Sequence, residues 1–82
     1  NEGIIKVRFS ISSVSQALEL LNQSKWKDKI ESYSENEIIF KLKNEEISYL
    51  NRYFVHNDLS VNAIIPVKNL EEYFLDITGK TK

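Results

Sequence analysis

Few residues in this chain have the types and spacing needed for chemistry. A phosphate-binding loop of the form G-x-x-x-x-G-K-[ST] cradles phosphate in the backbone N–H groups of a glycine-rich turn. Gly79-Lys80-Thr81 matches its last three positions, but Phe74 stands where the first glycine should be. The run also follows a predicted helix instead of preceding one. The sequence therefore predicts no phosphate loop at this place.

The single histidine and the paired acids have simpler explanations than catalysis. His56 is the only histidine, so no second imidazole or thiolate offers a metal pair or a catalytic partner. An imidazole at the expected end of a helix is typical of a solvated group or a partner of the helix dipole. Glu45-Glu46 and Glu71-Glu72 each fall in the first turn of an expected helix, where their charge complements the dipole. We therefore expect no catalytic, cofactor-binding or metal-binding residue.

Composition indicates one small globular domain. The chain has 82 residues, of which 41% are hydrophobic and 28% charged, a balance typical of a folded chain. The net charge of −1 provides no positive field that would attract nucleic acid. No apolar run approaches about 18 residues, and no signal-peptide pattern opens the chain. The absence of cysteine excludes disulfides and thiolate zinc sites, and the absence of methionine leads us to expect a piece of a longer protein.

The first third of the chain predicts a strand followed by a helix. Residues 1–3 are expected to be a linker remnant. Residues 4–11 alternate between apolar and polar, which predicts a half-buried strand. Its inward row is Ile5, Val7, Phe9 and Ile11. Ser12 or Ser13 is expected to cap a helix that ends near residues 22–24. The apolar positions of that helix are Val14, Ala17, Leu18 and Leu21.

A hairpin, a second helix and a fourth strand are expected next. Residues 26–33 and 37–43 should pair across a turn at residues 34–36. Asn44 is expected to cap the second helix, and the fourth strand is expected to stop at Pro66. The positions expected to share an inward face are Ile38, Phe40 and Leu42 in the third strand, Ile47, Leu50, Asn51 and Phe54 in the helix, and Leu59, Val61, Ala63 and Ile65 in the fourth strand.

The order β-α-β-β-α-β predicts an α+β fold of the ferredoxin-like type, a four-stranded antiparallel sheet with both helices on one face. We expect each helix to return the chain to a neighbouring strand through a right-handed crossover. An added C-terminal helix is expected over residues 69–79, with Asn69 as its cap and Gly79 at its end. Its apolar face is Leu70, Phe74 and Ile77. The domain then spans residues 4–79, and residues 80–82 form a tail.

This last helix also resembles a family. The pattern Leu-Glu-[Glu/Asp]-[Tyr/Val]-Phe-Leu-x-[Ile/Leu]-Thr-Gly looks like the last helix of bacterial ABC-transporter ATP-binding subunits, where it closes an accessory domain behind the nucleotide-binding domain. Asn69 stands where the family usually has Ser or Thr, which cap equally well. The matching residues are Leu70, Glu71, Phe74, Leu75, Thr78 and Gly79.

The resemblance implies a non-catalytic C-terminal accessory or regulatory domain. ATP and Mg would belong to the parent protein, an ATPase coupled to transport, whose ATP-binding motifs lie upstream of this chain. The parent would be cytoplasmic and peripheral to the inner face of the cell membrane through the transporter complex. The implied partners are the nucleotide-binding domain of the same chain, membrane permease subunits and a second copy in a homodimer.

Two other binding modules share this order of elements. RNA-recognition motifs display aromatic residues on the open sheet face through their third strand. Phe40, the aromatic residue of the third strand here, is expected to face inward with Ile38 and Leu42. We therefore expect no nucleic acid among the partners of this chain. The open face is instead expected to carry Lys6, Arg8, Lys41 and Lys43 among Ser60, Asn62 and Ile64. The alternative function is an ACT-like small-molecule-binding regulatory domain, although the turn at residues 10–13 lacks the glycine usual there.

Overall fold

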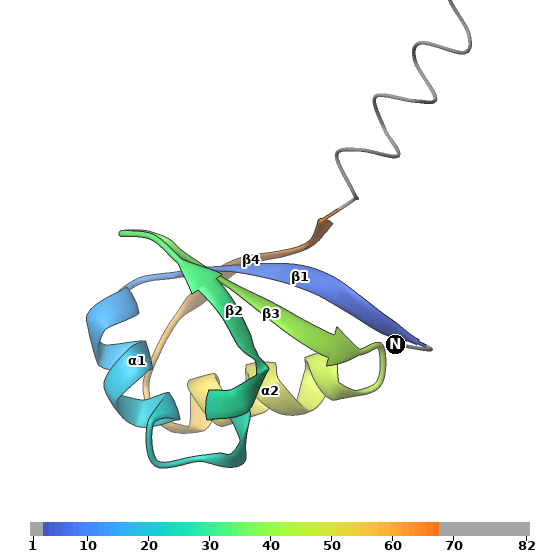
Figure 1. Cartoon of the computed structure of the whole chain (residues 1–82). Coiled ribbons are helices and arrows are strands. Elements are labelled where there is room, and N and C mark those ends of the chain that lie inside the picture. Colours follow the sequence, from blue (N-terminus) through green and yellow to red (C-terminus); the bar gives the residue numbers. More distant parts are fainter. Residues whose placement is uncertain (1–2, 68–82) are drawn as a thin grey trace, which may run out of the picture.

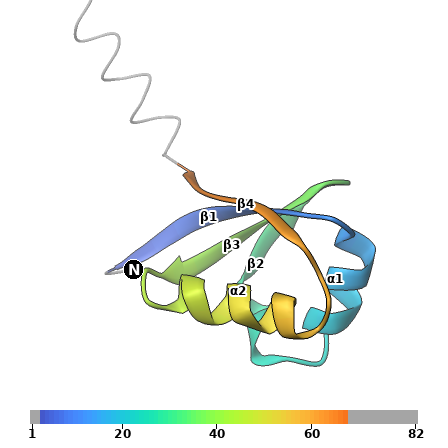
Figure 2. The ribbon, with the colours of Figure 1, turned by 180° about the vertical axis from the view of Figure 1, so that it is seen from behind.

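The computed structural model describes residues 3–67 of the chain. These residues form a four-stranded antiparallel sheet in the order β2-β3-β1-β4, with both α-helices on one of its faces (Figures 1 and 2). The strands are β1 (Ile4–Ile11), β2 (Ile30–Tyr33), β3 (Glu37–Lys43) and β4 (Val61–Val67). The helices are α1 (Val14–Leu21), α2 (Glu46–His56) and the 3-10 helix η1 (Lys25–Lys29). The predicted α+β class is confirmed.

The two helical connections each skip one strand. β3 lies between β1 and β2, and β1 lies between β3 and β4. The prediction that each helix returns the chain to a neighbouring strand is therefore wrong. The hairpin explains the difference, because β3 turns back from β2 and takes the place beside β1, which leaves β2 at the edge of the sheet. No helix within residues 3–67 is both long and apolar enough to cross a membrane.

Serine side chains start the first two helical segments. Ser13 lies in an extended conformation and its hydroxyl accepts a hydrogen bond from the Gln16 backbone N–H at 3.3 Å. This confirms Ser13 as the cap of α1. Ser24 caps η1 in the same way, accepting from the Trp26 backbone N–H at 3.1 Å. Because η1 turns the indole inward, Trp26 joins the core, although its segment was predicted as part of a strand.

The start of α2 differs from prediction. Its cap position is Glu45, whose side chain makes no capping hydrogen bond, so the prediction of Asn44 as the cap is wrong. The carboxylate of Glu46 reaches back instead and accepts a hydrogen bond from the Lys43 backbone N–H at 2.8 Å. Lys29 Nζ lies 3.3 Å from the same carboxylate. One acidic side chain thus ties η1, the end of β3 and the start of α2 together.

The core fills the space between the sheet and the two helices. Phe9 of β1 packs edge-to-face against Phe40 of β3, with ring centroids 5.2 Å apart. Phe54 of α2 lies 5.9 Å from Phe9, so the aromatic cluster joins the central strands to their cover. The largest fully buried side chains are Phe9, Phe40, Phe54, Leu21, Ile38, Leu42, Leu50 and Val7. The predicted inward row of β3 is therefore confirmed.

A bulge interrupts the alternation of β4. Ala63 pairs with Ser10, but the next pair along joins Val61 to Ile11. Asn62 is therefore an extra residue on β4 with no counterpart on β1. A one-residue bulge moves every later side chain of that strand to the opposite face of the sheet.

The bulge reverses the predicted faces of three residues. Ile64 lies opposite Phe9 and packs against the core, although it was predicted to face outward. Ile65 lies opposite Arg8 and is 45% exposed, although it was predicted to face inward. Ala63 shares the face of Ile65. The inward parity predicted for Ala63 and Ile65 is wrong for this reason.

The ends of two strands also differ from prediction. β4 runs through Pro66 to Val67 instead of stopping, because an edge strand needs ladder partners on one side only and tolerates proline. Ile5, predicted in the inward row of β1, is 36% exposed. The pairing of β4 with β1 begins at Lys6, so no described residue of β4 flanks Ile5.

Candidate functional site

The residues that carry the family resemblance lie outside the described part of the chain. They are Leu70, Glu71, Phe74, Leu75, Thr78 and Gly79. The partial match to a phosphate loop, Gly79-Lys80-Thr81, lies outside it as well. A candidate site must therefore be built from the surfaces that residues 3–67 form.

Chemically active side chains are dispersed over residues 3–67. His56 is exposed at the end of α2. The pair Glu45-Glu46 lies at the opposite end of the same helix. No three His, Cys, Asp or Glu side chains gather in this part of the chain to hold a metal ion. The described residues bring together surfaces, and not a catalytic constellation.

The face of the sheet opposite the helices is uncovered by any described element (Figures 1 and 2). We call it the open face. The antiparallel register arranges its side chains in rows across β4, β1 and β3. The rows are Val67, Lys6 and Lys41; then Ile65, Arg8 and Ile39; then Ala63, Ser10 and Glu37. The central strand is therefore polar, whereas β4 contributes only apolar side chains.

The apolar row of β4 is unusual for the edge of a sheet. Ala63, Ile65 and Val67 all face away from the helices, and Ile65 is 45% exposed. Edge strands usually carry charge on such a surface, because an apolar edge invites contact with another segment. Ile39 of β3 extends the apolar area across Arg8. This apolar row, with Ile65 as its most exposed large side chain, is the part of the open face best suited to contact another segment.

Charge on the open face is predominantly positive. Lys6 Nζ lies 3.0 Å from Glu31 Oε2, and Arg8 Nε lies 3.7 Å from Glu37 Oε1. Arg8 Nε is also buried and makes no hydrogen bond within the described residues. Four basic side chains therefore share the open face with these two acids. They are Lys6, Arg8, Lys41 and Lys43. Exposed ion pairs contribute little stability, so this charge pattern matters more for the choice of partner.

An open groove lies between the turn after β1 and the turn of the β2–β3 hairpin. The two turns are joined by a hydrogen bond from the Ile11 backbone N–H to the Asn36 carbonyl oxygen at 3.1 Å. The groove has a volume of about 670 Å³, which falls in the range of small-molecule sites. Its lining residues are Ser12, Ser13, Val14, Ser15, Leu18, Tyr33, Ser34, Glu35 and Asn36. Apolar side chains thus lie beside hydroxyl, amide and carboxylate groups.

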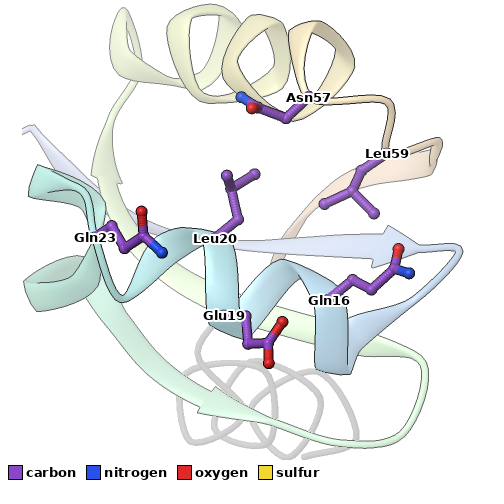
Figure 3. Close-up of a pocket in the computed structure, with 6 residues that line it drawn as sticks. All are labelled: Gln16, Glu19, Leu20, Gln23, Asn57 and Leu59. Carbon is purple, nitrogen blue, oxygen red and sulfur yellow. The ribbon is translucent and has the colours of Figure 1, made fainter.

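A second groove separates α1 from the end of α2 (Figure 3). Leu20 points from α1 towards α2, and Leu59 enters from the other side. The Tyr53 hydroxyl donates to the Leu20 carbonyl oxygen at 3.2 Å and ties the two helices together. The lining residues are Gln16, Glu19, Leu20, Gln23, Asn57 and Leu59. Apart from Glu19 their polar groups are neutral amides, so this groove has little charge with which to select a ligand.

The titration of Glu46 belongs to the fold and not to a site. The hydrogen bond from the Lys43 backbone N–H lowers the pKa of the Glu46 carboxyl below its ordinary value, and the nearby Lys29 ammonium lowers it further. Glu46 sits where β3 turns into the helix that covers the other face. Its charge therefore holds elements of the covered side together.

Sequence reasoning found half of the open face. The basic residues of β1 and β3 were predicted there, and the structure places them there. The apolar row of β4 was missed because the bulge at Asn62 was not foreseen. The signal was the uninterrupted apolar run Ala63-Ile64-Ile65, in which strict alternation has already been lost.

Comparisons of this chain with known protein families, with curated proteins and with solved structures find no match. A proposal about function therefore depends on the residues of the chain itself.

Proposed function

We propose that this chain is the non-catalytic C-terminal accessory domain of an ABC-transporter ATP-binding subunit and that its fold is ferredoxin-like. The observation that carries the proposal is the run from Leu70 to Gly79, which resembles the closing helix of that domain. The run begins three residues after the last strand of an α+β domain of the size expected. Motif and domain thus stand in the order that the family has.

The topology supports the ferredoxin-like part of the proposal. The chain order is β1, α1, β2, β3, α2, β4, with η1 inserted before β2. Both helical connections skip one strand of an antiparallel sheet, as in a split βαβ arrangement. Both α-helices lie on one face of the sheet (Figure 1).

In this proposal the chemistry belongs to the parent protein. ATP and Mg bind its nucleotide-binding domain, and the accessory domain contacts that domain, permease subunits or its own twin. The parent works at the inner face of the cell membrane. The open face supports a contact role, because its apolar edge and net positive charge suit a macromolecular surface better than a reacting small molecule.

The coding sequence upstream of Asn1 in the native gene tests the proposal directly. We expect G-x-x-x-x-G-K-[ST], followed by a Leu-Ser-Gly-Gly-Gln-like motif and an acidic strand. A different enzyme domain upstream would contradict the transporter assignment. A start codon immediately before Asn1 would contradict it too, because the chain would then be a free-standing protein.

The isolated chain provides a biochemical test of the same proposal. Thermal unfolding should be unchanged by millimolar Mg-ATP, because a ligand raises the unfolding temperature only when it binds the folded state. A rise of several degrees would contradict a purely accessory role.

The groove beside the hairpin turn favours a second candidate, an ACT-like regulatory domain. The groove lies at the turn after the first strand, which is where the resemblance to ACT-type domains would place a ligand. Its lining combines apolar and polar groups. An amino acid from a panel should then raise the unfolding temperature, and Tyr33→Ala should abolish the rise. Tyr49→Ala is the matched control, because Tyr49 is similarly exposed but lies on α2. No shift with any amino acid would remove this candidate.

A further inference from the structure

The open face and the chain that follows β4 complement each other. β4 ends at Val67 with an apolar row uncovered by any described element. Residues 69–79 have the sequence pattern of a short helix with Leu70, Phe74 and Ile77 on one face. We propose that residues 69–79 of the same chain dock as a helix on the open face. Docking of this kind is independent of the transporter assignment.

A surface is required if this segment is to be helical at all. Isolated helices shorter than about 12–15 residues are marginal in water, because nucleation is costly. The segment has 11 residues. Its apolar stripe therefore needs an apolar partner, and the covered face of the sheet is already occupied by α1 and α2 (Figures 1 and 2). The apolar area of the open face offers Ala63, Ile65, Val67 and Ile39.

Charge favours the same pairing. At about 100° per residue, Glu71 falls on one flank of the apolar stripe, about 90° from its centre, whereas Asp76 and Glu72 lie towards the opposite side of the helix. Between Asn69 and Gly79 the segment contains three acids and no basic residue. The open face carries four basic side chains against two acids, and Lys41 and Lys43 are in no ion pair within residues 3–67. An acidic helix thus meets a basic surface, which orients it.

Length and position also agree. Only Lys68 separates the end of β4 from the expected cap Asn69. A helix of this length extends about 16 Å, and the strand from residue 63 to residue 67 extends about 13 Å. A helix that turns back at Val67 and runs antiparallel to β4 therefore spans the three rows of the open face. Its far end then lies over the row of Ala63, Ser10 and Glu37.

A paramagnetic label in the full chain tests this placement. The chain has no cysteine, so Lys80→Cys carries a single nitroxide just beyond the expected helix. We expect the strongest NMR broadening at the backbone amides of Ala63, Ser10 and Glu37 and the weakest along α2. Broadening that is strongest on α2, or absent from the whole sheet, would overturn the proposal.

A matched pair of variants and a mixing experiment complete the test. Ile65→Lys should abolish the broadening, whereas Val55→Lys should leave it unchanged, because Val55 is also exposed but lies on α2. Equal effects of the two substitutions would contradict docking at Ile65. A mixture of isotope-labelled chain and separately spin-labelled chain shows whether residues 69–79 of one molecule dock on the open face of another. Broadening that appears only in the mixture would mean that a second copy occupies the open face.

Discussion

The two faces of the sheet are built from adjacent residues but have opposite characters. Phe9 faces the helices and is fully buried within the aromatic cluster, whereas its neighbour Arg8 lies on the open face with Nε covered and the side chain 40% exposed. On β4, Ile64 packs on the core and Ile65 faces outward. The comparison teaches that the covered face supplies the stability, which leaves the open face available for a partner.

Replacing neighbours on β1 gives the largest difference between the faces. Phe9→Ala should lower the free energy of unfolding by about 3–5 kcal/mol, because it leaves a cavity beside Phe40 and Phe54. Arg8→Ala should change it by less than about 1 kcal/mol, because the ion pair with Glu37 is long at 3.7 Å and both side chains are partly exposed. Chemical denaturation measures both, and equal losses would contradict the assignment of the faces.

Replacing neighbours on β4 tests the bulge. Ile64→Ala should cost about 2 kcal/mol, since Ile64 packs against the core only in part. Both substitutions are compared in a Phe74→Ala background, which weakens the proposed docking on the open face, and there Ile65→Ala should cost about 1 kcal/mol or less. Strict alternation without a bulge predicts the reverse order, so a greater loss at Ile65 would contradict the observed register.

The turn that leads from α2 to β4 should permit a gain in stability. Asp58 has a φ of 65°. The Asp58 backbone N–H donates to the Val55 carbonyl oxygen, and the Leu59 backbone N–H donates to the Phe54 carbonyl oxygen. This is the helix end where glycine is preferred, and a carboxylate is unfavourable beside the negative end of the dipole. Asp58→Gly should stabilise the domain by about 0.5–1 kcal/mol in thermal or chemical unfolding.

Asp58→Asn is the control for that substitution. It removes the charge and keeps a side chain that tolerates the left-handed conformation. A gain from asparagine equal to that from glycine would assign the effect to charge alone. A loss with glycine would mean that the Asp58 side chain has a role of its own.

The smallest expected effect is a pH dependence on the covered side. The folded state lowers the pKa of Glu46 from its ordinary 4.5, so its carboxylate adds stability above that pH. The contribution is lost as pH falls through the folded-state value, because protonation then removes the hydrogen bond acceptor and the charge. Glu46→Gln should be less stable than the native chain at pH 7, and the difference should shrink below pH 4.5. A difference that is constant from pH 7 to pH 3 would contradict this role.

The sequence predicted most of the covered side because periodicity reports burial. The alternation of residues 37–43 and the helical spacing from Ile47 to Phe54 each match the observed core. The Ser13 cap was likewise predictable, because its geometry is local. The burial of Trp26 was not, because a 3-10 turn has no strong periodicity with which to reveal its inward side.

The open face was harder to predict because it depends on register. Alternation identifies two faces of a strand but does not reveal an extra residue at Asn62, which exchanges them. Strand order is equally non-local, since the position of β3 between β1 and β2 follows from pairing and not from any single segment. The apolar row of β4 could therefore be recognised only once pairing with β1 was known.

A double-mutant cycle between Ile65 and Phe74 tests most directly whether the open face is an interface. Phe74→Ala should lower the free energy of unfolding by about 3 kcal/mol in the native chain, as loss of a docked aromatic side chain does. In an Ile65→Lys background the same substitution should cost much less, giving a coupling energy of about 1–3 kcal/mol between the two sites. Additive effects of the two substitutions in chemical denaturation would contradict docking of residues 69–79 on the open face.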